Sequence, residues 1–154
     1  MRDVFIIGAH TTQFKKWPEK DYKTLTREAY EDVLADAGLE DGERIGLAWF
    51  GNCGMWAHSQ GSVRGQVCFT PLVREGRFPE RVPMINVEGA CATAAMTLNG
   101  ACTDVRAGDT EVSLAIAVEK LYDPDSPEAT KAIFDAAIDR LRPGRMGGVL
   151  PRSR

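Results

Sequence analysis

The chain has 154 residues, of which 44% are hydrophobic, and a formal net charge of -3 at pH 7. This length and composition fit one globular domain with a core of its own. The acidic balance argues against a general binder of nucleic acids or of membrane surfaces, and we recognise neither a signal peptide nor an apolar run of membrane-spanning length.

The first half of the chain predicts two strands with a helix between them. Residues 3–8 form an apolar run of the kind that is buried in a parallel sheet, and a dinucleotide-binding GxGxxG motif does not follow it. Asp21 is predicted to cap a helix that ends at Gly38. The apolar stripe of this helix consists of Tyr22, Leu25, Ala29, Tyr30, Val33, Leu34 and Ala37. A second buried strand is expected at residues 45–50.

An irregular stretch rich in glycine and polar residues follows the second strand, and a helix of small residues can start after about Ser59. Proteins of the α/β class place binding groups on such loops. Asn52, His58 and Arg64 are therefore candidates for substrate binding. His58 is also a possible base, although a lone histidine in a loop is more often a surface or capping residue.

A third buried strand is predicted at Met84–Val87, and the next helix closes at Gly108. The residues of that helix that share one apolar face are Ala95, Leu98, Cys102 and Val105. Cys91 stands at the corner between the strand and the helix. The start of a helix offers unpaired N–H groups and a positive dipole end, which favour a thiolate and an oxyanion. The same cysteine could equally be a small hydrophobic residue of a packed turn.

A fourth strand is expected at residues 111–118, and Ser126 with Pro127 then starts another helix. The apolar stripe of this helix consists of Ile133, Phe134, Ala137, Ile138 and Leu141. Strands and helices alternate throughout, so the predicted fold is α/β, with a mostly parallel sheet and helices on both faces. Ligands of such sheets collect at the carboxyl ends of the strands, where Cys91 lies.

The four cysteines are Cys53, Cys68, Cys91 and Cys102. They lack CxxC spacing and a dense disulfide framework, so a reducing cytoplasm is the expected location. A zinc site made of Cys53, His58 and Cys68 would match no usual ligand spacing, and no metal is expected.

Several of these segments resemble the N-terminal half of the thiolases, most of all the sterol-carrier-protein type and its acetyl-CoA acetyltransferase-like relatives. The segments that carry the resemblance are NVEGACA at residues 86–92, VRAGD at 105–109 and LAIAVEK at 114–120. The agreement extends over about residues 3 to 140 in the same order. It divides the chain into a thiolase-like domain (residues 1–120), the start of a loop domain (121–141) and a basic tail rich in Gly and Pro (142–154).

The resemblance implies a reaction. In that family the cysteine matching Cys91 attacks a 3-ketoacyl-CoA, releases a shortened product and passes the acyl group to coenzyme A; the reverse reaction is a Claisen condensation. Gly89, Ala90 and Ala92 would shape the turn and its oxyanion site. Thr93 stands where the family commonly has smaller residues, so we expect added bulk beside the thiol and a changed acyl preference.

The same resemblance implies partners. A thiolase subunit is more than twice as long, and its second half carries the activating histidine and a second cysteine; His10 and His58 stand in no matching motif. We therefore expect a homo-oligomer, with residues 84–88 as the dimer contact, and a possible small zinc-ribbon and OB-fold partner. Two alternatives remain open: a ketosynthase-type condensing enzyme, and a non-catalytic thiolase-like subunit or fragment.

Overall fold

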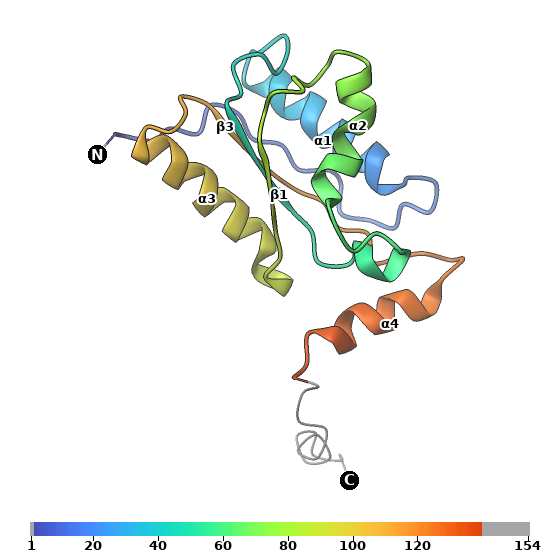
Figure 1. The fold of residues 1–154 in the computed structure, drawn as a ribbon. Helices are drawn as coiled ribbons and strands as arrows, with labels where there is room; N and C mark the ends of the chain where they lie inside the picture. The colour runs from blue at the N-terminus through green and yellow to red at the C-terminus, as the bar shows by residue number, and fades with distance from the viewer. Residues whose placement is uncertain (1, 140–154) are drawn as a thin grey trace.

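The computed structural model describes residues 2–139, and its centre is a parallel sheet of three strands (Figure 1). The strands are β1 (Leu47–Gly51), β2 (Met84–Val87) and β3 (Ser113–Ala117), in the spatial order β2-β1-β3. The helices are α1 (Tyr22–Asp36), α2 (Arg64–Arg74), α3 (Thr93–Ala107) and α4 (Pro127–Ala136), with 3-10 turns η1 (Met55–His58) and η2 (Ala90–Ala92). Three of the four predicted strands are confirmed, with bounds that differ by two residues or fewer.

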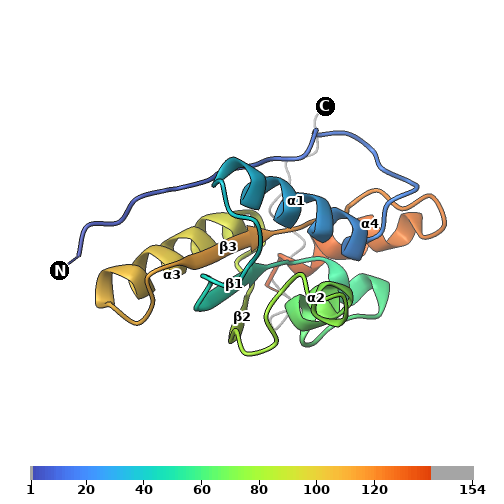
Figure 2. The same ribbon diagram turned by 90° about the horizontal axis from the view of Figure 1, so that it is seen from above.

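Helices cover both faces of this sheet: α3 lies on one side, and α1 and α2 lie on the other (Figures 1 and 2). Successive side chains of β1 point to opposite faces of the sheet, as the pleat of a strand requires. Phe50 packs against Gly65 at the start of α2, while Trp49 packs against Gly100 in the middle of α3. The predicted parallel sheet with helices on both faces is therefore confirmed.

The main core lies between the sheet and the pair α1 and α2. Tyr30, Phe50 and Phe69 are almost completely buried in it. Tyr30 and Phe69 meet edge to face with ring centroids 5.4 Å apart, which is a favourable aromatic geometry. The Tyr30 hydroxyl donates to the Arg77 carbonyl at 2.8 Å, and burial raises the pKa of Tyr30 to about 12.

Helix α1 matches its prediction closely. Asp21 accepts a hydrogen bond from the Thr24 N–H at 2.7 Å, which is the N-cap interaction. Gly38 has a φ of 66°, a left-handed conformation that suits glycine after a helix. The buried apolar residues of the helix, Tyr22, Leu25, Tyr30 and Leu34, all belong to the predicted stripe.

The predicted strand at residues 3–8 is wrong. The segment lies beyond β3 and forms no strand, and the large side chains of Phe5, Ile6 and Ile7 are 79%, 69% and 53% exposed. A cavity of about 260 Å³, lined by residues 3–8 and by residues 111–113, lies between the segment and the start of β3. A strand needs a hydrogen-bonded neighbour. The segment has none, because the cavity separates it from β3, the nearest edge of the sheet.

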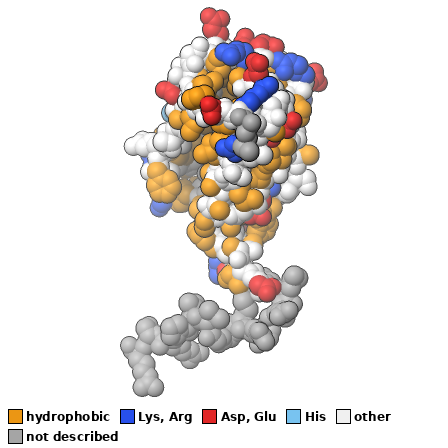
Figure 3. Space-filling view, turned by 90° about the vertical axis from the view of Figure 1, so that its left-hand side faces the viewer, with side chains coloured by type: hydrophobic (Ala, Val, Ile, Leu, Met, Phe, Trp, Pro, Cys, Tyr) orange, Lys and Arg blue, Asp and Glu red, His pale blue; other side chains and the backbone are white. Residues whose placement is uncertain are grey.

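The residues of the predicted stripe of α3 are not its buried residues: Ala95 and Leu98 are exposed, while Cys102 and Val105 are half-buried and line the cavity beside the start of β3. The residues that α3 buries are Thr93, Thr97, Gly100, Ala101 and Asp104, whereas Met96 and Leu98 are 44% and 46% exposed. Hydrophobic side chains gather on the face of the molecule shown in Figure 3, which is the side of α3. Helix α3 packs so closely on the sheet that mainly small residues fit between them. The larger apolar side chains of Met96 and Leu98 therefore remain exposed on the other side of the helix.

Helix α4 begins at Pro127 as predicted, but Ser126 does not cap it through its side chain. The Ser126 hydroxyl donates instead to Glu128 Oε1 at 2.9 Å. Of the predicted stripe, Ile133 is buried, Phe134 and Ile138 are largely exposed, and Leu141 lies outside the described residues, as does the predicted tail. Among residues 2–139, no helix has the length and apolar character needed to cross a membrane.

We predict that Gly100→Ala destabilises the domain, because a Cβ at this position would lie 2.5 Å from the Trp49 ring. Overpacking of this kind typically costs about 1–3 kcal/mol. The free energy of unfolding, measured by urea denaturation, should fall by that amount. The exposed neighbour Asn99 provides the control, and Asn99→Ala should change it little. Equal stability of the two variants would contradict the close packing of α3 on β1.

Candidate active site

Cys91 lies in the 3-10 turn η2, between the end of β2 and the start of α3, and is exposed. Helix α3 itself begins two residues later, at Thr93. The turn is closed by the Ala92 N–H, which donates to the Gly89 carbonyl at 2.9 Å. The thiol is therefore presented to solvent at the carboxyl end of a parallel strand, the edge where such sheets bind ligands.

The turn is held in an unusual conformation by side-chain hydrogen bonds. Ala90 has a φ of 49°, in the left-handed region that costs a non-glycine residue about 1 kcal/mol or more. Thr93 Oγ1 accepts from the Gly89 N–H at 2.9 Å and donates to the Ala90 carbonyl at 2.7 Å. Glu88 Oε1 accepts from the Ala90 N–H at 2.7 Å. These three bonds fix the N–H of Gly89 and both backbone polar groups of Ala90.

The structure corrects the expectation for Thr93. Its side chain is 7% exposed, and a Cβ on Gly51 of β1 would lie 2.8 Å from its methyl group. The threonine therefore points into the space between α3 and the sheet, where its hydroxyl braces the turn. It adds no bulk to the exposed side of the turn, so the argument for a changed acyl preference no longer applies.

The backbone N–H of Cys91 takes part in none of the hydrogen bonds among residues 2–139. The neighbouring N–H groups of Ala90 and Ala92 are already used, by Glu88 and by Gly89. An N–H that is fixed in place and has no internal acceptor is the kind of donor that an oxyanion site requires. Gly89, Ala90 and Ala92 form or flank the turn that holds this N–H, and their part in an oxyanion site stays a prediction.

A cavity of about 220 Å³ lies beside the turn. Its lining residues come from the loop after β1, the start of α2, the turn and the end of α4, and they are Cys53, Trp56, Gly61, Arg64, Glu88, Ala90, Ala136 and Ala137. Cys91 follows Ala90 directly without lining the cavity itself. The cavity combines an indole and a thiol with one cation and one carboxylate, which suits a ligand with apolar and polar parts.

Cys53 is a second thiol beside this turn. Burial raises its pKa, and the negative charge of Glu88, which also hydrogen-bonds to the thiol, raises it further. A raised pKa keeps the thiol protonated and weakens it as a nucleophile. Sequence reasoning considered Cys53 only as a ligand of the rejected zinc site, since only folding brings it to Glu88.

Of the three predicted substrate-binding residues, Arg64 lies at the cavity and Asn52 does not. Arg64 lines the cavity, and its guanidinium donates to the Asn52 carbonyl. The Asn52 side chain is 1% exposed and fully engaged. Its Nδ2 donates to the Val118 carbonyl at 2.7 Å, and its Oδ1 accepts from the Met55 N–H at 2.9 Å. Asn52 therefore orders the loop after β1 and has no group left for a substrate.

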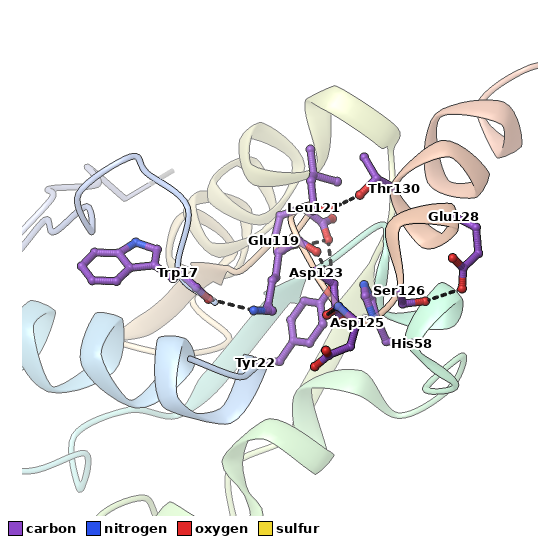
Figure 4. A network of polar contacts seen from close by, with 11 residues as sticks. Trp17, Tyr22, His58, Glu119, Leu121, Asp123, Asp125, Ser126, Glu128 and Thr130 are labelled. Atoms are coloured by element: carbon purple, nitrogen blue, oxygen red, sulfur yellow. Dashed lines mark hydrogen bonds and ion pairs between the residues drawn. The ribbon is translucent and has the colours of Figure 1, made fainter. Parts of the chain in front are cut away.

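His58 is not among the residues that line the cavity. Its ring lies beside a polar network that includes Tyr22 and Asp123 (Figure 4). Its Nδ1 lies 3.3 Å from Asp123 Oδ2, and its ring meets Tyr22 edge to face. Its Nε2 is buried without a hydrogen-bond partner among the described residues. The other histidine, His10, lies 3.2 Å from Asp32. Neither histidine lines the cavity beside Cys91.

Sequence reasoning assigned no role to Glu119, which follows β3 and lies in this region. Its carboxylate accepts from the N–H groups of Cys53 and Gly54 at 2.9 and 3.0 Å, and from the Tyr22 hydroxyl at 3.4 Å (Figure 4). It thereby ties the loop after β1 to the end of β3 and the start of α1. Among residues 2–139, no group of His, Cys, Asp and Glu side chains could hold a metal ion.

We predict that Thr93→Val destabilises the turn while Thr93→Ser preserves it. Valine keeps the shape of threonine but leaves the Gly89 N–H without its acceptor, at a cost of about 1–3 kcal/mol. The Ala90 carbonyl loses one of its two hydrogen bonds and keeps the one from the backbone N–H of residue 93. Urea denaturation should show this loss for the valine variant. Serine retains the hydroxyl, so its loss should be smaller. A serine variant as unstable as the valine variant would mean that the methyl group, rather than the hydroxyl, holds the turn.

We predict that alkylation of Cys53 by iodoacetamide requires a higher pH than alkylation of a free cysteine peptide, because its pKa is raised. Peptide mass mapping after timed labelling gives the rate at Cys53 alone. Glu88→Gln removes the negative charge beside the thiol, so the midpoint of the pH profile should fall. The exposed Glu40→Gln serves as the control. An unchanged midpoint in Glu88→Gln would contradict the contact between Cys53 and Glu88.

The sequence of the chain matches one known family over most of its length. The family model described as "Thiolase, N-terminal domain" matches residues 4–143. The chain is 34% identical over 137 residues to an acetyl-CoA acetyltransferase of Methanocaldococcus jannaschii, which covers 89% of this chain and 33% of that protein. It is 29% identical to an acetyl-CoA acetyltransferase of Methanothermobacter thermautotrophicus, over 89% of this chain and 34% of that protein.

A third relative is the benzoylsuccinyl-CoA thiolase subunit BbsB of Thauera aromatica. It is 30% identical over 118 residues, which are 77% of this chain and 28% of that protein. The chain thus spans about a third of the length of the curated relatives that it matches.

Proposed function

The chain belongs to the thiolase family, whose N-terminal domain it matches over residues 4–143, and we propose that it carries the nucleophile of an acyl-CoA thiolase. The observation that supports this is the position of Cys91: an exposed thiol in a braced turn at the carboxyl end of a parallel strand, with its own N–H unused. Coenzyme A would be the acyl carrier, entering as substrate and leaving as product.

The proposed chemistry is acyl transfer through a thioester. In thiolysis, Cys91 Sγ attacks the keto carbon of a 3-ketoacyl-CoA and the Cys91 N–H donates to the oxyanion that forms. Cleavage of the bond between carbons 2 and 3 releases acetyl-CoA, whose carbanion carbon takes up a proton. The acyl group then passes from Cys91 to the thiol of coenzyme A, and the cysteine is regenerated.

Turnover would require groups from outside residues 2–139. Neither His10 nor His58 lines the cavity beside Cys91, and each lies against a carboxylate instead. The thiol that lines the cavity, Cys53, has a raised pKa, so it stays protonated and is a poor base. We propose that the base and acid are supplied by a further domain or subunit, in a homo-oligomer or with a small zinc-ribbon and OB-fold partner. One relative is itself named a thiolase subunit, which supports this.

Other features fit the same proposal. The exposed apolar residues of α3 call for cover by another protein surface. The cysteines Cys53, Cys68, Cys91 and Cys102 are all free, which favours the reducing cytoplasm as the location. Arg64 is the proposed contact for a polar group of the substrate, since it alone of the three predicted binding residues lines the cavity.

The test is intact-mass analysis of the chain after incubation with acetyl-CoA. An acetyl adduct should form in the wild type and in Cys102→Ser, and should be absent in Cys91→Ser. Coenzyme A is released in equal amount if the thioester is exchanged as proposed. An adduct that persists in Cys91→Ser would contradict the assignment. If no adduct forms, with or without the C-terminal two thirds of a relative added, the alternative of a non-catalytic thiolase-like subunit would be favoured.

A further inference from the structure

The cavity beside the Cys91 turn contains a cation without a counter-charge, Arg64, and we call this cavity the Arg64 cavity. The guanidinium of Arg64 donates to the Asn52 carbonyl, which is a neutral acceptor. None of the ion pairs within residues 2–139 includes Arg64. A guanidinium carries several N–H donors, so most of those of Arg64 stay available to a ligand.

Arg64 differs in this respect from the other arginines of residues 2–139. Three of them, Arg27, Arg77 and Arg81, each lie against a glutamate. The others have no ion pair among the described residues, but they are exposed, so water solvates their charge. These exposed arginines are Arg2, Arg44, Arg74 and Arg106. Arg64 is half-buried and unpaired. A cation that has lost part of its water and gained no counter-charge indicates a place for an anion.

The position of Arg64 in the fold strengthens this indication. It is the first residue of α2, so the positive end of the helix dipole adds to the charge of its side chain. The carbonyl that it contacts belongs to Asn52, whose side chain is itself held by Val118 and Met55. The guanidinium is therefore held at one nitrogen in front of the cavity, and a planar fork of this kind suits a carboxylate.

The rest of the lining offers apolar surface and one further donor. Ala136 and Ala137 come from the end of α4, and Trp56 comes from η1. Within residues 2–139, the indole N–H groups of Trp17 and Trp49 have acceptors, whereas that of Trp56 has none. An organic group with a short apolar part and an anionic end matches this lining.

Glu88 is the one carboxylate of the cavity lining, and it does not neutralise Arg64. Its Oε1 accepts from the Ala90 N–H at 2.7 Å, and the Cys53 thiol also hydrogen-bonds to it. Glu88 is exposed as well, so water and these two bonds reduce its repulsion of an anion. The anion at Arg64 therefore does not have to compete with Glu88 for the guanidinium.

The size and place of the cavity indicate which part of a substrate enters it. Its volume of about 220 Å³ is below the range of about 300–1,000 Å³ that pockets for drug-sized ligands occupy, so a whole acyl-CoA does not fit. Ala90 lines the cavity and directly precedes Cys91. The group that enters is thus attached close to the carbon that Cys91 attacks. The phosphates of coenzyme A lie at the far end of its long arm, away from the thioester.

We propose that the substrate is a 3-ketoacyl-CoA whose transferred acyl group is short and ends in a carboxylate, and that Arg64 binds this carboxylate. The proposal rests on the proposed function, because it assumes that the acyl group is delivered to Cys91. Arg64 is then the residue that determines the acyl preference. An acyl group without the carboxylate would enter the same cavity and leave the guanidinium without its partner, which disfavours it.

The test compares the binding of glutaryl-CoA and pentanoyl-CoA. Their acyl chains have the same length, and the last carbon is a carboxylate in the first and a methyl group in the second. Both are titrated into the full chain carrying Cys91→Ser, and binding is followed by the resonance of the Trp56 indole N–H, which Trp56→Phe identifies. Glutaryl-CoA should bind about tenfold or more tightly than pentanoyl-CoA.

A matched pair of variants assigns this preference to Arg64. Arg64→Gln removes the charge and keeps a donor for the Asn52 carbonyl, so the preference should fall to about twofold or less. Arg74→Gln changes an exposed arginine at the other end of the same helix and should leave the preference intact. The dispersion of the amide spectra checks that both variants are folded.

Four results would overturn the proposal. They are binding of neither compound, equal affinity for the two, a preference that survives in Arg64→Gln, and equal weakening of both compounds by Arg64→Gln. The last result would assign Arg64 to a phosphate of coenzyme A. Since Cys91→Ser cannot form the thioester, these readouts do not depend on acyl transfer. Failure of the proposed function shows instead as a missing acetyl adduct in the wild type.

Discussion

The position of β1 between two other parallel strands is the constraint on which the rest of the structure depends. A strand with neighbours on both edges and helices on both faces is largely buried, so its residues must fit closely. Trp49, Phe50 and Gly51 meet this requirement in turn, the first and last toward α3 and the second toward α2. Gly51 is decisive for the site, because its lack of a side chain makes room for Thr93.

The path from β1 to the site is therefore short. Thr93 packs against Gly51. Its hydroxyl accepts from the N–H of Gly89 and donates to the carbonyl of Ala90, the residue with the left-handed conformation. The exposed Cys91 follows one residue later. The loop that follows β1 is also held by side-chain hydrogen bonds. Glu119 accepts from the N–H groups of Cys53 and Gly54. Asn52 accepts from the N–H of Met55. The two halves of the candidate site are thus both built on the carboxyl end of one buried strand.

Local sequence signals were sufficient for most of the elements. A cap, a stripe of apolar residues and a closing glycine locate α1, and a run of β-branched residues locates β2. They failed at residues 3–8, where the strand pattern is present and the pairing partner is absent from the described residues. They also failed to tell which face of α3 is buried, because close packing on a sheet favours Gly100 and Ala101 over larger apolar residues.

The residues of the candidate site likewise fall into those that the sequence could predict and those that it could not. The corner that holds Cys91 is readable from the sequence because it consists of neighbours along the chain. The roles of Asn52 and His58 are not, since their partners Val118 and Asp123 lie more than sixty residues away. A polar residue in a glycine-rich loop has the same local appearance whether it binds a ligand or completes a network. For this reason Glu119 was assigned no role, and Cys53 was considered only as a zinc ligand.

The pairing of β1 with β3 has a consequence for how the domain folds. Leu47 pairs with Ser113, 66 residues further along the chain, and everything from η1 to α3 lies in between. Contacts of such long sequence separation form slowly, because the entropy of closing the loop is lost before the contact is gained. During synthesis, β1 can pair with β2 well before β3 has left the ribosome. For that interval one edge of β1 stays open, and an unpaired strand edge is exposed to aggregation.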